Sequence, residues 1–358
     1  MSNIVISGYY GFGNAGDEAM LCAIIDAIRK EEADAHITVI SGNPTETSKK
    51  HNIHAVGTFS AFGILKAIAN SDLVISGGGS LLQDATSIRN TYYYLSIMAL
   101  AKMMGKKVML YSQGIGPLNR PSTRRAVSFI LRFVDTITVR DSISKSELES
   151  LGIEDVEVTA DAVLAMQPAD LSIGKRILEG YTSKLPKSIE NPKRIGVAVR
   201  SWKDDTEYRE SLANVLSRLQ EQDNVEIIFI PMSHPEDTKE AKIIASYMPK
   251  GAIVLEGPFS TEEQVSLSGN VDLMIGIRLH ALVFSSLMGK PKITSFLHMI
   301  GQEPIGTMTH LREEALYQRC HKLLHSKEEY QASYDRIEAL RLNSQRNAEI
   351  AISLLKDY

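Results

Sequence analysis

Cysteine, tryptophan and long apolar runs are scarce in this sequence of 358 residues, which has two cysteines and one tryptophan. Cys22 and Cys320 lie far apart and match no metal-binding or redox spacing. No apolar run reaches the ~18 residues that a membrane-spanning helix needs. The first apolar segment is also too short for the core of a secretory signal. These absences predict a cytoplasmic protein without disulfides.

Charge of one sign is also lacking, because 39 Lys and Arg stand against 43 Asp and Glu. Without a basic excess we expect no nucleic-acid partner, and any anion site must be a local concentration of Arg and His. No His/Asp cluster has metal-ligand spacing, so we expect neither a metal nor a cofactor. The composition, 44% hydrophobic and 23% charged, is typical of a globular protein.

Short β-branched runs alternate with helical patterns from one end of the chain to the other. This alternation predicts an α/β fold of parallel sheets covered by helices on both faces. It lapses over residues 168–192, which contain three prolines, and we place the domain connection there. We therefore expect Rossmann-like domains over 1–170 and 171–325. The charged segment 326–358 is expected to be helical, and one possibility is that this helix packs against both domains.

One place breaks the alternation. After the predicted helix 279–288, residues 292–297 resemble a helix start where a buried strand is expected. Either the sheet ends early or a strand, with an active-site loop, is missing between Pro291 and Lys292; we favour the second alternative. The other predicted strands are 4–7, 37–40, 73–76, 107–112, 136–139, 157–159, 195–199, 225–230, 253–255 and 273–275. The other predicted helices are 18–30, 61–69, 91–104, 123–133, 142–151, 207–222, 237–247, 262–268 and 327–357.

A glycine-rich segment, residues 8–18 (GYYGFGNAGDE), lies between the first strand and the first helix. It fits the dinucleotide pattern G-x-G-x-x-G, but Asp17 and Glu18 at the helix N-terminus would repel a phosphate. A dehydrogenase is therefore disfavoured, also because no ribose-binding acid follows the second strand. Asp17 either caps the helix or, together with Gly13 and Asn14, faces the cleft, binds sugar hydroxyls or acts as acid or base.

A second glycine-rich segment, residues 76–84 (SGGGSLLQD), follows a strand at the edge where open α/β sheets bind ligands. The alternative to a ligand-binding role for this segment is a purely structural turn. Arg140 follows strand 136–139 and is either a ligand contact or a salt-bridge partner, and Asp161 either lines the cleft or caps a turn. The residues of the second segment that we expect at the ligand are Gly79, Ser80, Gln83 and Asp84.

In the second half, strand 195–199 delivers Arg200 at its carboxyl end, just before the single tryptophan, Trp202. Arg200 can make a bidentate contact with carboxylate or phosphate, unless it forms a surface ion pair. His234 follows strand 225–230 and is a further candidate. Arg278 and His280 stand where a strand passes through a glycine into a helix. Cations there oppose the helix dipole unless an anion is bound, which favours an anionic ligand.

The ordered set of motifs resembles the polysaccharide pyruvyl transferase family, and within it the bacterial CsaB-type enzymes. The motifs are GYYGFGNAGDEA, SGGGSLLQD, SQGIGP, VRDS, TADA and MIGIRLHALVFS, and the resemblance runs from residue 3 to about residue 290. Each motif is weak alone, but their order is specific. The resemblance implies a GT-B-like fold, with two Rossmann-like domains facing one another across a cleft.

The resemblance also implies phosphoenolpyruvate as donor and a glycan or lipid-linked oligosaccharide as acceptor. The product is a pyruvate ketal on a secondary cell-wall polymer, which in the CsaB-type branch anchors surface-layer proteins. The family's donor-binding arginine matches Arg200, and its R-L-H triplet matches Arg278, Leu279 and His280. A lipid-linked acceptor would bring the protein into peripheral contact with the cytoplasmic membrane, but no amphipathic basic helix stands out.

On this resemblance Arg200 and Arg278 clamp the donor, and His280 binds the departing phosphate. Asp17 is the first candidate for the acid or base and His280 the second, and the sequence leaves the choice open. Two other functions stay open. One is a nucleotide-sugar-dependent GT-B glycosyltransferase, which would hold a ribose with Glu256 or Glu262. The other is a non-catalytic sugar-binding protein.

Overall fold

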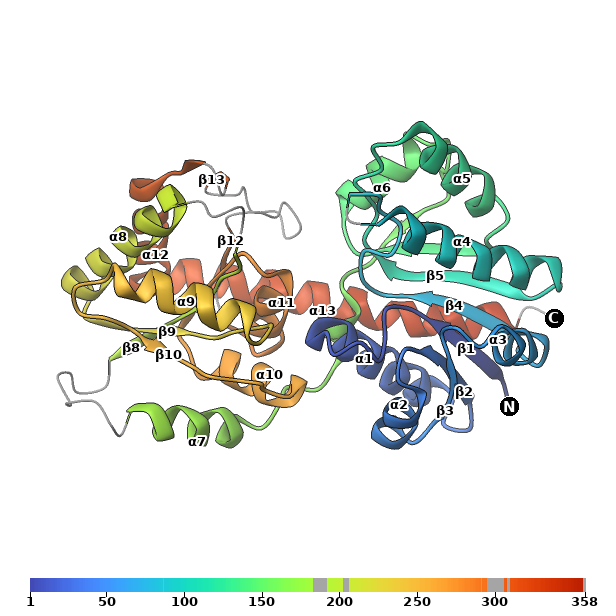
Figure 1. Ribbon diagram of the computed structural model, residues 1–358, viewed down its shortest axis with the longest axis horizontal. Helices are drawn as coiled ribbons and strands as arrows, with labels where there is room; N and C mark the ends of the chain where they lie inside the picture. The colour runs from blue at the N-terminus through green and yellow to red at the C-terminus, as the bar shows by residue number, and fades with distance from the viewer. Residues whose placement is uncertain are drawn as a thin grey trace. The chain divides into compact units, whose positions relative to one another are not determined.

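The chain folds into two compact units, each built on a parallel sheet (Figure 1). The computed structural model describes residues 1–85, 87–182, 192–201, 206–290, 292–294, 306–307 and 310–356. Unit 1 comprises residues 1–166 and 340–358, and unit 2 comprises residues 167–339. The long helix α13 (Lys327–Lys356) begins in unit 2 and ends in unit 1. Among the described helices, none is long and apolar enough to cross a membrane.

Unit 1 contains a seven-stranded sheet in the order β3-β2-β1-β4-β5-β6-β7, with every pairing parallel. The strands are β1 (Asn3–Ser7), β2 (His36–Ser41), β3 (His54–Gly57), β4 (Leu73–Gly77), β5 (Lys107–Gln113), β6 (Thr136–Val139) and β7 (Glu157–Val158). The helices are α1 (Ala15–Glu31), α2 (Pro44–His51), α3 (Ala61–Ala69), α4 (Ile88–Met103), α5 (Pro121–Leu131), α6 (Ser142–Glu149) and the 3-10 helix η1 (Ala162–Ala165).

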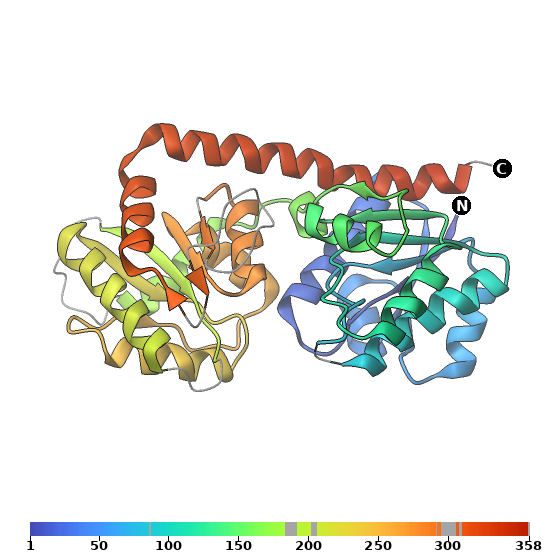
Figure 2. The ribbon, with the colours of Figure 1, turned by 90° about the horizontal axis from the view of Figure 1, so that it is seen from above.

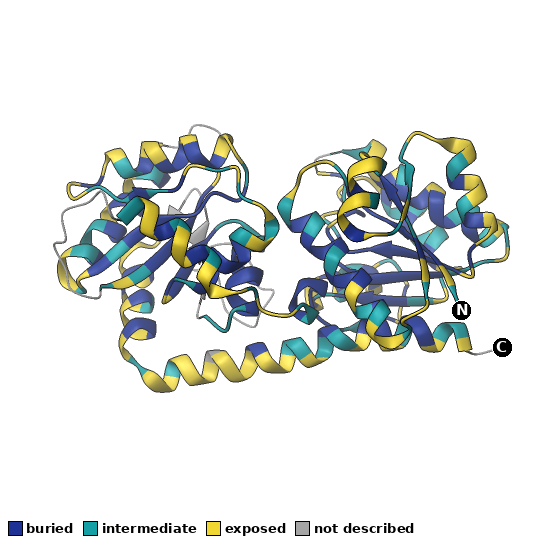
Figure 3. Cartoon of the chain, turned by 90° about the horizontal axis from the view of Figure 1, so that it is seen from below, coloured by how far each residue is buried: buried dark blue, intermediate teal, exposed yellow. Residues whose placement is uncertain are grey.

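Helices cover both faces of this sheet, so the central strands are buried on both sides (Figure 3). One face forms a core with α1, η1 and the end of α13. The other face forms a core with α3, α4 and α5, which Figure 2 shows on the side away from α13. The apolar runs of β1, β4 and β5 are continuous for this reason, since neither face of a central strand meets water.

The end of α13 is an integral part of unit 1. Asn347 has no exposed surface, and its Oδ1 accepts hydrogen bonds from Thr138 Oγ1 at 2.6 Å and Thr159 Oγ1 at 2.9 Å. Ser344 Oγ donates to the Asp161 carbonyl at 2.8 Å. These contacts connect the C-terminal segment to β6 and to the chain that follows β7.

Unit 2 contains a five-stranded parallel sheet in the order β10-β9-β8-β11-β12 and an antiparallel pair of β13 and β14. The strands are β8 (Lys193–Ala198), β9 (Val225–Phe229), β10 (Ile253–Val254), β11 (Leu273–Gly276), β12 (Lys292–Thr294), β13 (Gly306–Thr307) and β14 (His310–Leu311). The helices are α7 (Leu171–Thr182), α8 (Thr206–Gln222), α9 (Glu236–Ser246), α10 (Thr261–Gly269), α11 (Leu279–Leu287) and α12 (Glu313–His325).

The prediction of a helix start at residues 292–297 was wrong where the structure describes them. Lys292–Thr294 forms β12, which pairs in parallel with β11 so that Ile293 lies beside Ile275. The strand expected after α11 is therefore β12 itself, and no strand is missing between Pro291 and Lys292. Three residues are too few to show a period of two, so only the pairing with β11 identifies this strand. Residues 295–297 lie outside the described residues.

Candidate functional site

The charged side chains singled out by the sequence lie at strand ends, one group in each unit. The carboxyl ends of parallel strands share one edge of the sheet, so loops after neighbouring strands come together there. In unit 1, β1, β4, β5 and β6 are consecutive in the sheet, and the loops after them carry the glycine-rich motifs and Arg140. In unit 2, β9, β8 and β11 are consecutive, and the loops after them carry His234, Arg200 and Arg278.

Asp17 is the third residue of α1 and is buried, with 9% of its surface exposed. It lies against the second glycine-rich loop. Gly79 adopts a φ of +73°, and a methyl group placed on it would lie 3.0 Å from Asp17 Oδ1. Glycine at this position therefore serves both the backbone conformation and the close approach of the carboxyl group.

The carboxyl group of Asp17 is a weaker acid than an ordinary aspartate. Burial, followed by the negative charges of Glu18 and Asp161, raises the pKa of Asp17 to about 7, although Arg140 acts in the opposite direction. Near neutral pH the group can therefore hold a proton or release it. That property suits a general acid or base.

Arg140 follows β6, and its side chain is largely buried. Its Nη2 donates to Ser80 Oγ at 2.9 Å, its Nε donates to Asp141 Oδ2 at 3.4 Å, and its Nη1 lies 3.8 Å from Asp161 Oδ2. A methyl group on Gly114 would lie 2.5 Å from Arg140 Nη2, so glycine makes room for the guanidinium. The structure thus shows Arg140 as a salt-bridge partner, and its contact with a ligand stays a prediction.

Asp161 caps η1, since its Oδ1 accepts a hydrogen bond from Val163 N at 3.1 Å. Its Oδ2 is buried and accepts no hydrogen bond. Asp17, Asp141 and Asp161 thus outnumber the single cation Arg140 in this cluster. Because buried negative charge is costly without partners, the proton on Asp17 relieves part of this excess.

Asn14 and Gly13 lie at the start of α1 and are exposed. Asn14 is the N-cap residue, and its Oδ1 accepts a hydrogen bond from Gly16 N at 3.1 Å. The helix is therefore capped by Asn14 and not by Asp17. Gly13 has open space around its Cα and a φ of +77°. Both residues stay candidates for acceptor contacts.

Asp84 makes its described contacts within the protein. Its Oδ1 accepts from Asn119 N and its Oδ2 from Arg120 N, both at 2.8 Å. Burial acts to raise the pKa of Asp84, but these hydrogen bonds outweigh it, and the pKa is lowered. Both oxygens hold the loop before α5, and acceptor binding by Asp84 stays a prediction. Gln83 also makes a contact within its loop, as its Oε1 accepts from Ala85 N at 2.9 Å.

In unit 2, Arg278 is the N-cap residue of α11 and binds Asp237, a residue of α9 that the sequence did not reveal. Arg278 Nε donates to Asp237 Oδ2 at 3.1 Å, and Nη2 donates to Oδ1 at 2.5 Å. Asp237 has no exposed surface. The inference that Arg278 is costly without an anionic ligand was therefore wrong, because the protein supplies an anion itself.

Asp237 organises this whole edge of unit 2. Its Oδ2 also accepts hydrogen bonds from Met232 N at 3.2 Å and Ser233 N at 2.9 Å, which fixes the loop after β9. Burial, followed by the positive charge of Arg278, lowers the pKa of Arg200, while Asp237 raises it. Arg200 and Arg278 follow neighbouring parallel strands, β8 and β11, so both lie at the same edge of the sheet. An acid in the first turn of the helix after β9 was the available sequence signal for Asp237.

The remaining predicted donor residues lie along the same edge. Leu279 and His280 are the first two residues of α11, and the His280 ring centroid is 6.3 Å from that of Phe284. His234 is exposed in the loop after β9, with its Nδ1 at 3.1 Å from Thr238 Oγ1. Trp202, which follows Arg200 closely in the sequence, lies outside the described residues.

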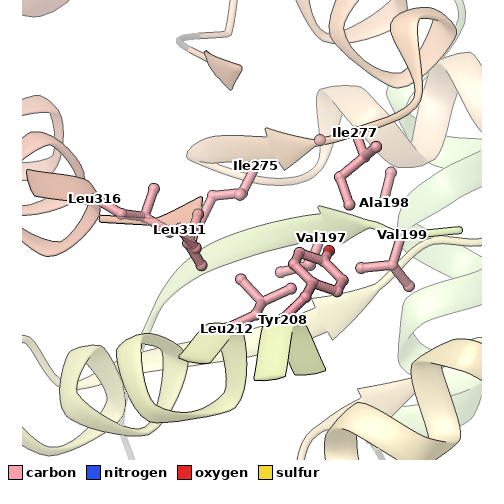
Figure 4. Close-up of a pocket in the computed structure, with 10 residues that line it drawn as sticks. Val197, Ala198, Val199, Tyr208, Leu212, Ile275, Ile277, Leu311 and Leu316 are labelled. Carbon is pink, nitrogen blue, oxygen red and sulfur yellow. The ribbon is translucent and has the colours of Figure 1, made fainter. Parts of the chain in front are cut away.

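An apolar pocket lies between β8, β11 and α8 (Figure 4). Its lining is hydrophobic apart from the Tyr208 hydroxyl, and it includes Val199 and Ile277, which precede Arg200 and Arg278. A pocket of this kind does not suit a multiply charged donor, so the arginine edge is the better candidate for the anion. The other lining residues are Val197, Ala198, Leu212, Ile275, Gly276, Leu311 and Leu316.

The statement that no His/Asp cluster has metal-ligand spacing was wrong. Asp223, His321 and His325 bring three ligand atoms within 4.8 Å of one another. His321 Nδ1 lies 2.6 Å and His325 Nε2 2.8 Å from Asp223 Oδ1, so hydrogen bonds account for the grouping without a cation. Asp223 precedes β9, at the edge of the sheet opposite Arg200. The cluster is therefore separate from the candidate site.

Comparison with known proteins decides the family. The sequence profile of the polysaccharide pyruvyl transferase family matches residues 14–294. The chain belongs to the polysaccharide pyruvyl transferase family. One relative is the amylovoran biosynthesis protein AmsJ of Erwinia amylovora, with 23% identity over 81% of this chain and 82% of AmsJ. The protein is therefore a member of a transferase family, and a relative takes part in polysaccharide biosynthesis.

Solved structures show that this pyruvyl transferase family member has a GT-B-like fold. The UDP-GlcNAc 2-epimerase of Neisseria meningitidis, bound to UDP-GlcNAc, superposes with a TM-score of 0.66 at 13% identity, over 99% of this chain and 100% of that chain. A glycosyltransferase of Rickettsia africae superposes with a TM-score of 0.64 at 15% identity, over the whole of both chains. At these identities the likeness concerns the fold alone.

Proposed function

We propose that this member of the family transfers the pyruvyl group of phosphoenolpyruvate to a sugar of a secondary cell-wall polysaccharide or of its lipid-linked precursor. The products are a pyruvate ketal and phosphate, and no cofactor takes part. The observation that carries the proposal is that Arg200 and Arg278 follow two neighbouring strands, β8 and β11, at one edge of the unit 2 sheet. We place the reaction in the cytoplasm.

The donor chemistry fits this edge of unit 2. Phosphoenolpyruvate carries a carboxylate and a phosphate on a small frame, and Arg200 and Arg278 are proposed to bind them. Asp237 uses Nε and one N–H of Nη2 of Arg278, which leaves three of the five guanidinium N–H donors for a ligand. A bound Arg is also held in one orientation, so less rotamer freedom is lost when the donor binds. His280 and Leu279, in the first turn of α11, and His234 complete the proposed donor set.

The proposed acceptor site lies at the edge of unit 1. Asp17 provides the proton-exchanging group there, beside the backbone of Gly79 and Ser80. Gly13 and Asn14 offer exposed polar backbone and side-chain atoms for sugar hydroxyls. Gln83 and Arg140 are proposed to shape the loops of the site, since their described contacts are with the protein itself.

The proposed steps assign one proton carrier to each substrate. His280 protonates the methylene carbon C3 of phosphoenolpyruvate, which makes C2 an oxocarbenium-like centre. A sugar hydroxyl forms a C–O bond to C2 and gives its proton to Asp17. The C2–O bond to phosphate then breaks, and a second hydroxyl closes the ketal and returns a proton to His280. The proton on Asp17 leaves with phosphate, so the protons balance.

Donor binding tests the proposal directly. We expect calorimetric titration of the full chain to detect phosphoenolpyruvate and not a UDP-sugar, and Arg278→Ala to weaken binding by at least about tenfold, the loss of a charge-assisted contact. Arg194→Ala is the matched control. Arg194 lies near the start of β8, whereas Arg200 follows the end of the same strand. Preferential UDP-sugar binding would favour the glycosyltransferase alternative, with a ribose held at Glu256 or Glu262.

Turnover with a panel of sugar acceptors, read by mass spectrometry and phosphate release, separates an enzyme from a sugar-binding protein. A product mass that corresponds to a pyruvate ketal is the expected result. Acceptor binding without phosphate release in every case would overturn the enzymatic proposal.

A further inference from the structure

The first unit concentrates positive charge in a chain whose net charge is −4. Residues 85–134 contain no Asp or Glu at all. Over residues 58–134 the only acids are Asp72 and Asp84, and neither is available on an outer helix face. Asp84 is buried in its loop, and Asp72 Oδ2 accepts from Asn3 N at 2.8 Å, at the start of β4. The cations of this stretch are Lys66, Arg89, Lys102, Lys106, Lys107, Arg120, Arg124, Arg125 and Arg132.

The fold gathers these cations on one side of unit 1. Helices α3, α4 and α5 pack against the same face of the sheet, where they share one hydrophobic core. Their inward residues are buried, and their outward faces are exposed (Figure 3). We name this outer surface the α3–α5 face. Its exposed cations are Lys66 on α3, Arg89 on α4, and Arg125 and Arg132 on and just after α5.

Large apolar side chains stand among these cations. Four of the nine phenylalanines of the chain lie on the α3–α5 face with more than half of their surface exposed. Single exposed apolar residues are common, but a set that covers α3, α5 and the turns beside them, joined on α4 by Tyr92 and Met103, marks an interaction surface. The exposed fractions are 94% for Phe59, 78% for Phe62, 62% for Phe129 and 54% for Phe133, and Leu65, Tyr92 and Met103 are also exposed.

Two of the phenylalanines of the α3–α5 face form a pair at one end of it. Phe129 and Phe133 contact one another edge to face, with ring centroids 5.5 Å apart. Lys102, at the end of α4, pairs with Asp135 at 2.6 Å, which brings the end of α4 beside the turn that holds Phe133. At the other end, Tyr93 of α4 donates to the Thr58 carbonyl at 3.2 Å, next to Phe59. The aromatic groups are thus distributed along a continuous helical layer.

We infer that the α3–α5 face binds the surface of an anionic lipid bilayer. Phenylalanines enter the boundary between headgroups and acyl chains, and the surrounding Lys and Arg meet the lipid phosphates. This inference goes beyond the proposed function and needs no particular substrate. It is compatible with the expectation that no single amphipathic basic helix stands out, because three helices form the surface together.

The charge pattern favours a bilayer over other partners. A second copy of the same face would bring like charges together, which disfavours self-association through it. A nucleic acid would be attracted by the cations. It would contact the four exposed phenylalanines only if its bases stacked on them, which requires the rings to form a flat platform. A bilayer surface uses both features at once, since it offers anionic headgroups and an apolar layer a few ångströms below them.

Sedimentation of the full chain with vesicles tests the inference. We expect binding to vesicles of phosphatidylcholine mixed with phosphatidylglycerol, weak binding to phosphatidylcholine alone, and a loss of binding as salt concentration rises. The double variant Arg125→Glu/Arg132→Glu and the double variant Phe62→Ser/Phe129→Ser should each lower the partition coefficient by at least about tenfold. All four residues are exposed, so both variants are expected to fold.

Matched controls lie on other parts of unit 1. Lys30→Glu on α1 and Leu342→Ser on α13 change exposed residues away from the α3–α5 face and should leave vesicle binding unchanged. Three results would overturn the inference: no binding to anionic vesicles, equal binding to both kinds of vesicle, or anionic binding that neither double variant weakens. Retention by single-stranded RNA together with failure to bind vesicles would instead identify a polyanion site. Titration with phosphoenolpyruvate is independent of all these outcomes and tests the proposed function separately.

Discussion

At the scale of single residues, the surroundings of a side chain decide its chemistry. Asp17 belongs to a motif that is compatible with ordinary helix capping, yet Asn14 takes the cap and Asp17 is buried beside Gly79. Arg278 stands at a helix N-terminus, which disfavours a cation, yet Asp237 neutralises it. In both cases a residue distant in sequence sets the behaviour of the group.

The raised pKa of Asp17 predicts the pH dependence of turnover. If Asp17 accepts a hydroxyl proton, kcat/KM rises with pH through about 7, because only the ionised form of the free enzyme is active. Asp17→Asn should lose this limb and most of the turnover, with donor affinity nearly unchanged. A profile of kcat/KM that falls through the same pH would show that Asp17 acts as an acid instead. If only acceptor affinity changed, Asp17 would be a binding residue.

The same group predicts a pH-dependent stability. The folded protein holds the Asp17 proton more tightly than the unfolded chain, so stability falls as pH rises from about 4 to about 7. Asp17→Asn removes this effect, and its free energy of unfolding should exceed that of the unchanged protein above pH 7 by up to about 4 kcal/mol, and by little near pH 4. Urea unfolding at both pH values measures the difference. Asp26→Asn, exposed on the same helix, is the control, and an equal gain at both pH values would contradict the prediction.

Asp237 is expected to act through Arg278 as a positioning residue. Asp237→Asn keeps the size of the side chain but removes the charge that orients the guanidinium, so KM for phosphoenolpyruvate should rise by about tenfold with a smaller change in kcat. Steady-state kinetics separates the two parameters. A purely structural role would instead lower the yield of folded protein and leave the KM of the folded fraction unchanged.

At the scale of elements, sequence patterns missed several short or polar segments, and they also missed α12, a helix of 13 residues with a buried apolar side. β3 is a half-buried edge strand, and α2 (PTETSKKH) has a polar composition that reads as a loop. β12 has three residues and is identified by its pairing with β11. The long central strands, by contrast, could be predicted, because burial on both faces requires continuous apolar runs, and α3 could be predicted because its own segment is strongly apolar.

The end of α13 supports a prediction at this scale. Asn347→Ala removes the nearest acceptor of Thr138 Oγ1 and Thr159 Oγ1 and leaves space in a buried site, so we expect a loss of about 1–3 kcal/mol in the free energy of unfolding. Urea denaturation measures the loss. Ser353→Ala, on an exposed position of the same helix, should change stability by less than about 0.5 kcal/mol. A similar loss in both variants would mean that helix propensity and not the buried contact is responsible.

At the scale of the whole molecule, unit 1 is discontinuous in sequence. Residues 1–166 are completed by the C-terminal segment, whose Ala351 and Ile352 enter the core on the α1 face of the sheet. Removal of that segment would expose this core and break the buried hydrogen bonds that Thr138 and Thr159 donate to Asn347. The stability of the first half of the chain therefore depends on its last residues.

Truncation after residue 339 is expected to abolish the cooperative folding of unit 1. Limited proteolysis should then cleave within residues 1–166, while residues of unit 2 stay protected. A peptide of residues 340–358, added in excess, should restore part of the protection by mass action. Protection of residues 1–166 without the peptide would contradict this dependence.

The sequence by itself determined the α/β class, the order of most strands and helices, and the motifs that identify the family. These follow from local patterns, namely apolar periodicity, glycines at strand ends and charged residues beside them. Only the tertiary structure decided which charges meet. It brought Asp161 to Asp17, Asp237 to Arg278, Asn347 to β6, and the cations of α3, α4 and α5 to one face. The physical reason is that pKa values, ion pairs and surface charge depend on distances between residues that are remote in the chain.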